Sequence, residues 1–74
     1  MSNVIVYTLR GCPTCDKALA AIGERGVGFE ERRVDDNPRW WDEALKYASS
    51  VPVIIWADDD VEIGWDGEYG LETA

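Results

Sequence analysis

Histidine is absent from this chain, and cysteine occurs only twice among its 74 residues. Without an imidazole, the chain cannot use a Ser-His-Asp triad or a Cys-His pair, and it lacks a principal zinc ligand. No apolar stretch approaches the roughly 20 residues that a membrane-spanning helix needs. No charged segment followed by an apolar one opens the chain as a secretory signal would. We therefore expect a soluble, cytoplasmic protein.

Basic residues are also few, since seven Lys and Arg stand against 15 Asp and Glu, for a net charge of −8. Residues 1–37 hold five basic and six acidic side chains, whereas residues 38–74 hold two and nine. We therefore expect neither nucleic acid nor an anionic membrane as a partner. An anionic ligand would be steered toward the N-terminal half.

The patterning predicts one monomeric α/β domain over residues 1–74. β-branched and aromatic residues predict a buried strand over 3–9, and an apolar stripe at helical spacing predicts a helix from Pro13 to Gly26. Further along, the same criteria predict an edge strand over 27–34, a helix over 37–50, strands over 51–56 and 61–63, and one helical turn over 68–72. The order βαβαββ with that turn predicts a four-stranded mixed sheet flanked by helices.

The two cysteines, Cys12 and Cys15, stand where the first strand gives way to the first helix. A bridge between them would close too small a loop to stabilise the fold, so the pair serves chemistry or a metal. Pro13 suits the first position of a helix, which places Cys12 just before it. There, unpaired backbone N–H groups and the helix dipole favour a thiolate. Such positions lower the pKa of a thiol from about 8.5 to roughly 3.5–7.5.

The two sulfurs are expected to differ in role. Cys15 lies on the apolar helix face and should be the more buried thiol, whereas Cys12 should not be enclosed by apolar neighbours. Cys12 would attack a disulfide of a partner protein, and Cys15 would then attack Cys12 and release the reduced partner. Arg10 supplies a cation nearby, and Thr14 a hydroxyl that can bond a sulfur.

Other uses of the pair stay open. A C-x-x-C pair after a first strand also suits a soft-metal carrier, and a dimer can share an iron–sulfur cluster through Cys12. A third possibility is a non-catalytic interaction domain that uses the acidic surface and Trp65.

Three segments together resemble the glutaredoxins of the thioredoxin superfamily, especially the short glutaredoxin-like redoxins that serve ribonucleotide reductase. Residues 6–15 resemble the family's strand, loop and active site, residues 49–54 its cis-proline motif, and residues 63–67 its glycine–aromatic motif. The resemblance covers essentially the whole chain. It implies a thioredoxin-like fold and a dithiol–disulfide oxidoreductase active in electron transport and cell redox homeostasis. It implies no bound cofactor and no metal, only a redox-active Cys12–Cys15 disulfide.

The resemblance also implies the rest of the site. The Val51–Pro52 bond would be cis and lie against the active-site loop, and the backbone of Val51 would pair with an extended segment of the substrate protein. The residues expected to contact substrate on this basis are Arg10, Pro13, Thr14, Val51, Pro52, Gly64, Trp65 and Asp66.

Three departures from the glutaredoxin pattern concern glutathione. Leu9 stands where the family usually has Lys or Arg, Ile63-Gly64 replaces a Gly-Gly pair, and Gly67 replaces an acidic N-cap residue. Each weakens glutathione binding, and the acidic half repels that net-negative tripeptide. We therefore expect thioredoxin reductase as the reductant and protein disulfides as substrates, including that of ribonucleotide reductase. Glutathione is the alternative reductant.

Overall fold

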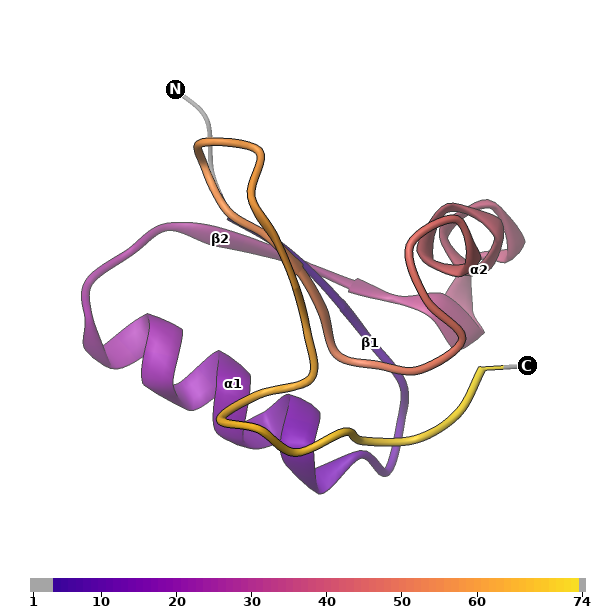
Figure 1. The fold of residues 1–74 in the computed structure, drawn as a ribbon, viewed down its shortest axis with the longest axis horizontal. Helices are drawn as coiled ribbons and strands as arrows, with labels where there is room; N and C mark the ends of the chain where they lie inside the picture. The colour runs from indigo at the N-terminus through magenta and orange to yellow at the C-terminus, as the bar shows by residue number, and fades with distance from the viewer. Residues whose placement is uncertain (1–3, 74) are drawn as a thin grey trace.

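The chain folds into strands and helices (Figure 1), and a computed structural model describes residues 4–73. The elements are β1 (Val4–Thr8), α1 (Pro13–Glu24), β2 (Phe29–Arg33), the 3₁₀ turn η1 (Val34–Asp36), α2 (Pro38–Leu45), β3 (Val53–Ile55) and β4 (Val61–Ile63). None of the described helices has both the length and the hydropathy that crossing a bilayer requires.

The strands form one mixed sheet in the order β2-β1-β3-β4. β1 pairs in parallel with β2, which requires the crossover that α1 supplies, and β3 is antiparallel to both β1 and β4. The charged strand β2 lies at an edge, as its run of Glu and Arg side chains predicts. The predicted four-stranded α/β fold is confirmed.

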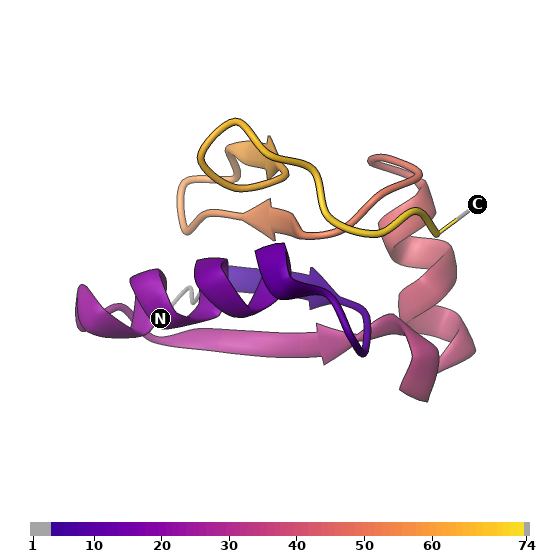
Figure 2. The same cartoon turned by 90° about the horizontal axis from the view of Figure 1, so that it is seen from below.

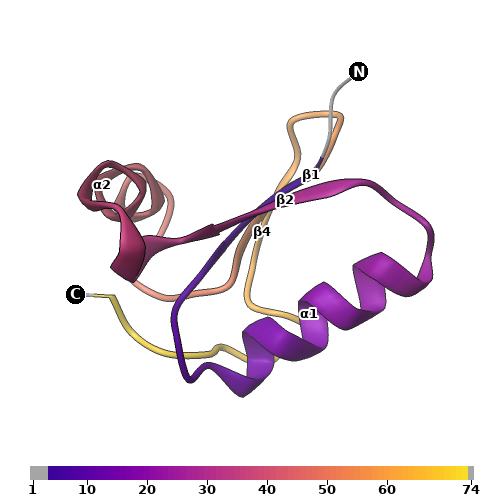
Figure 3. The same ribbon diagram turned by 180° about the vertical axis from the view of Figure 1, so that it is seen from behind.

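The two helices cover opposite faces of the sheet (Figures 1 and 3). Alternate residues of β1 point to opposite faces, so that Val4 and Val6 face α1 whereas Ile5 and Tyr7 face α2. The α1 face buries Val4, Val6, Ala18, Ile22 and Ile54, and the α2 face buries Tyr7, Val34, Ala44 and Val53.

Two element boundaries differ from the predicted ones. Helix α2 ends at Leu45, because the next N–H groups bond three residues back and tighten the chain into turns. Strand β3 begins at Val53, because Pro52 has no N–H with which to extend the ladder.

The prediction of a helical turn over 68–72 is wrong. The chain reverses at a tight turn in which the backbones of Trp65 and Glu68 bond each other, N–H to carbonyl, at 2.8 and 2.9 Å. It then continues as an extended segment, residues 69–73, which we call the strap. Ser50 and Glu72 form an antiparallel bridge there. In Figures 1 and 2 this yellow segment passes the first turn of α1. Cys12 precedes that turn and Cys15 lies in it.

Candidate active site

Cys12 lies immediately before helix α1 and is its N-cap, as predicted. Its backbone is extended, with φ −101° and ψ 102°, and its Sγ accepts a hydrogen bond from the backbone N–H of Cys15 at 3.1 Å. Pro13 is the first helical residue, and Gly11 turns the preceding loop with a φ of +79°. A helix-start N–H is therefore aimed at the sulfur of Cys12.

The sulfurs of Cys12 and Cys15 are joined in a disulfide, with their Cα atoms 5.3 Å apart. This is the oxidised state of the pair that the sequence predicts to be redox-active. Because the two residues are one helical turn apart, the bridge constrains the start of α1 and no distant part of the chain.

The expectation that Cys12 lies free of apolar neighbours is wrong. Cys12 and Cys15 are each only 1% exposed, and they cluster with buried Val51 and partly buried Leu9. The strap lies against this cluster, because a Cβ added to Gly70 would lie 2.5 Å from Cys12 Sγ. Both differences from the expectation involve residues 69–73, which run as the strap instead of a helical turn and contact buried Cys12.

The Val51–Pro52 peptide bond is cis, as the resemblance implied. Both side chains are buried, and that of Val51 packs against the two cysteines. The N–H of Val51 donates to the carbonyl of Leu71, and the carbonyl of Val51 accepts from the N–H of Gly70, each at 2.9 Å. The strap thus occupies both backbone groups of the residue before the proline.

Comparison with known proteins shows to which family the chain belongs. The family model described as glutaredoxin matches residues 4–61. The chain is 34% identical over 74 residues to Glutaredoxin 3 of Escherichia coli (strain K12), which covers 99% of this chain and 89% of that protein. The chain belongs to the glutaredoxin family. It is therefore a thiol–disulfide oxidoreductase with a thioredoxin-like fold.

Two further glutaredoxins agree. The chain is 33% identical over 75 residues to the glutaredoxin of Pseudomonas aeruginosa, covering all of this chain and 89% of that one. The crystal structure of a glutaredoxin from Archaeoglobus fulgidus matches with a TM-score of 0.74 and 27% identity, over 89% of this chain and 78% of that chain.

Arg10 is exposed in the loop between β1 and α1, but its charge is already paired. Its guanidinium lies 3.4 Å from a carboxylate oxygen of Asp35 and 3.4 Å from one of Asp36, both in η1. Of the two residues between the cysteines, Pro13 is exposed and Thr14 is buried. The hydrogen bond to a sulfur comes from the Cys15 N–H and not from the Thr14 hydroxyl.

The glycine–aromatic motif shapes the turn that leads into the strap. Gly64 has a φ of +83°, and a Cβ there would collide with the backbone of Glu68. Trp65 is half-buried against the core under α1, with the guanidinium of Arg25 5.6 Å from its ring centroid. Asp66 is exposed in the turn. In this structure Trp65 packs over the core and is only partly exposed.

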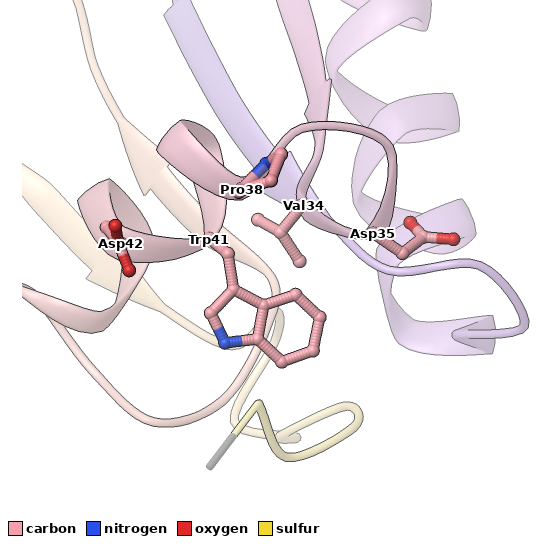
Figure 4. Close-up of a pocket in the computed structure, with 5 residues that line it drawn as sticks. All are labelled: Val34, Asp35, Pro38, Trp41 and Asp42. Atoms are coloured by element: carbon pink, nitrogen blue, oxygen red, sulfur yellow. The ribbon is translucent and has the colours of Figure 1, made fainter.

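A hollow that the sequence did not indicate lies beside the loop, between η1 and α2. Val34, Asp35, Pro38, Trp41 and Asp42 line it. Figure 4 shows the indole of Trp41 below Val34, with the carboxylates of Asp35 and Asp42 on opposite sides. Acidic walls disfavour an anionic occupant.

A polar cluster joins β1, β2 and α2 on the other side of the sheet from α1. The Tyr7 hydroxyl donates to Glu43 at 2.9 Å, and Arg32 donates to the Tyr7 hydroxyl at 3.1 Å and to Glu43 at 3.0 Å. Burial raises the pKa of Tyr7 above its ordinary value of 10.0, and the hydrogen bond to Glu43 raises it further. The sequence did not indicate this cluster, because its members come from three elements.

Metal ligands are not gathered around the cysteines. Over residues 4–73, no group of three or more His, Cys, Asp or Glu side chains is placed to hold a metal ion. Within that part of the chain, a soft-metal site would have only the two sulfurs.

Proposed function

We propose that this glutaredoxin reduces disulfides of partner proteins, with Cys12 as the attacking thiol and Cys15 as the resolving one. The observation that carries the proposal is the N–H of Cys15, which points at Cys12 Sγ from 3.1 Å at the start of α1. After reduction, the same N–H and the positive end of the helix would stabilise a thiolate on Cys12, against the opposing effect of its burial beside Val51 and Leu9.

The reaction transfers two electrons in two exchange steps. The Cys12 thiolate attacks one sulfur of the substrate disulfide, that S–S bond breaks, and the other substrate sulfur leaves and takes up a proton. Cys15 then loses its proton and attacks Cys12 Sγ, which breaks the mixed disulfide and releases the second substrate thiol. The substrate is left reduced, and the protein holds the Cys12–Cys15 disulfide that the structure has.

Substrate recognition is proposed to centre on Val51. An extended substrate segment would bond its backbone N–H and carbonyl, as in strand addition to a sheet edge. Pro13 and Thr14 lie between the cysteines and Pro52 follows Val51, which supports contacts from these residues. Arg10 is proposed to contact substrate from the loop between β1 and α1, two residues before Cys12. Gly64, Trp65 and Asp66 are assigned to the site because they form the turn that leads into the strap, which is hydrogen-bonded to Val51.

We propose thioredoxin reductase as the electron donor and ribonucleotide reductase among the protein substrates, in the cytoplasm. The acidic hollow beside the loop and the pairing of Arg10 with Asp35 and Asp36 support this donor over an anionic tripeptide. The use of only two cysteines, in one vicinal pair, suits a reducing compartment.

Glutathione-dependent turnover is the second candidate, and it is favoured by the glutaredoxin relatives. One assay decides between the donors: the oxidised protein is reduced either by thioredoxin reductase with NADPH or by glutathione, with insulin as the disulfide substrate. Faster turnover with thioredoxin reductase is expected. Faster turnover with glutathione would overturn the donor and leave the two-cysteine mechanism intact.

The cysteine roles have their own test. Cys12→Ser is expected to abolish insulin reduction, and Cys15→Ser to accumulate a mixed disulfide between Cys12 and the substrate. A mixed disulfide that forms in Cys12→Ser instead would reverse the two assignments.

A further inference from the structure

The strap pairs with the chain that precedes the cis proline as a bound strand would. The N–H of Thr73 donates to the carbonyl of Ser49 at 2.8 Å, and the N–H of Val51 donates to the carbonyl of Leu71 at 2.9 Å. These two bonds flank the antiparallel bridge between Ser50 and Glu72.

A third bond turns the strap over the disulfide. The N–H of Gly70 donates to the carbonyl of Val51 at 2.9 Å, so both backbone groups of Val51 are satisfied by this chain itself. At the same residue a Cβ would collide with the Val51 carbonyl and lie 2.5 Å from Cys12 Sγ. Only a residue without a side chain can lie this close, and with the strap in this position Cys12 is only 1% exposed.

We propose that the strap is an autoinhibitory segment that competes with substrate for Val51 and covers Cys12, so that the protein reacts only when the strap lifts. This inference rests on the proposed function, because it assumes that a substrate strand pairs with Val51. It goes beyond it in assigning the closed state to residues 69–73.

The strap is held in a way that permits release. Tyr69 is 69% exposed and Leu71 is 37% exposed, so neither side chain anchors the strap in the core. The hydroxyl of Thr73 is buried and makes no hydrogen bond to another residue within 4–73. The pair Lys17–Glu68, at 4.0 Å, is exposed at both ends and contributes little. Backbone hydrogen bonds therefore hold most of the strap, and segments of this kind open locally.

Three measurable properties of the protein depend on how often the strap is open. Exchange of the Val51 amide, reduction of the Cys12–Cys15 disulfide by dithiothreitol, and the reciprocal of the KM for insulin all scale with the fraction of molecules whose strap is open. A change that opens the strap must raise all three by the same factor.

The test variant is Gly70→Ala, whose Cβ cannot fit under the closed strap, and the matched control is Gly23→Ala in α1. At Gly23 a Cβ meets only Phe29 at an ordinary 3.9 Å. Gly70→Ala is expected to raise the three quantities together by roughly tenfold, equivalent to about 1.4 kcal/mol. Gly23→Ala should leave them unchanged. Hydrogen-exchange protection of the backbone amides that pair β1 with β3 is measured in both variants, to verify that the sheet stays folded.

The possible outcomes separate the two proposals. If Gly70→Ala and the unaltered protein reduce insulin with the same KM and react equally with dithiothreitol, the strap proposal is overturned and the proposed function stands. A rise in Val51 exchange without any rise in the dithiothreitol rate also overturns it, because the cover would not limit access to the sulfur. If neither protein reduces insulin although dithiothreitol reduces both, the proposed function fails, and competition with substrate fails with it.

Discussion

The backbone N–H of Cys15 lies 3.1 Å from Sγ of Cys12 and donates a hydrogen bond to it, so a sulfur takes the place of the usual oxygen cap of helix α1. This one hydrogen bond therefore has two roles. It satisfies a helix N–H that would otherwise lack a partner, and it directs a donor at the atom that we propose attacks the substrate.

This double role predicts that stability and activity separate at residue 12. Cys12→Ser keeps an oxygen cap for α1, whereas Cys12→Ala removes the cap and should lower the free energy of unfolding by about 1 kcal/mol relative to Cys12→Ser. Both variants should be inactive. Neither variant can form the disulfide, so urea denaturation compares the effect of the cap alone on their stability. Equal midpoints and equal slopes would contradict a capping role.

The turn before the strap depends on Gly64. Its φ of +83° is unfavourable for a side chain, and a Cβ there would also collide with the backbone of Glu68. Gly64→Ala should therefore lower the free energy of unfolding by about 3 kcal/mol, combining backbone strain and steric overlap. Gly11→Ala is the control, because Gly11 has a φ of +79° with nothing within 4 Å of a Cβ. It should cost about 1 kcal/mol from strain alone, and equal losses would show that the overlap at Gly64 is relieved.

The Tyr7 hydroxyl makes the free energy of unfolding depend on pH in the alkaline range. Burial raises the pKa of Tyr7 in the folded protein above the 10.0 of an ordinary tyrosine. The stability that the neutral hydroxyl contributes is therefore complete below pH 10 and declines as the pH rises from 10 through the folded pKa. Tyr7→Phe should cost about 1 kcal/mol at pH 7, through the lost bond to Glu43, and should lack this component of the alkaline decline.

Urea denaturation at pH 7 and above pH 10 measures this difference, and Tyr47→Phe is the matched control. Tyr47 is exposed, and its ring lies 6.5 Å from that of Tyr7, so its substitution leaves the bonds to Glu43 and Arg32 in place. A stability gap between the unaltered protein and Tyr7→Phe that stays constant up to high pH would contradict the assignment.

Local patterns were sufficient to predict most of the fold. Pro13 after Cys12 marked the helix start, the run Val4 to Tyr7 marked a strand buried on both faces, and the charges of β2 marked an edge. Each of these signals lies within one element, where side-chain type and spacing determine the local structure. The cis bond at Pro52 followed from the family resemblance and not from local physics.

The path of the strap was not predictable in this way. Its three bonds to Ser49 and Val51 join backbone atoms about twenty residues apart, and backbone bonds leave no side-chain pattern. Gly70 carries the one local clue, since a glycine can mark close approach to another group, but the sequence does not say to which group. Burial of Cys12 was missed for this reason.

The central claim is that the start of α1 ionises Cys12. The direct measurement follows the ultraviolet absorbance of the thiolate in the reduced protein as a function of pH, a signal that does not depend on access to the sulfur. A transition is expected well below the ordinary thiol value of about 8.5, present in Cys15→Ser and lost in Cys12→Ser. A lowest transition near 8.5, or one that survives in Cys12→Ser, would contradict the account.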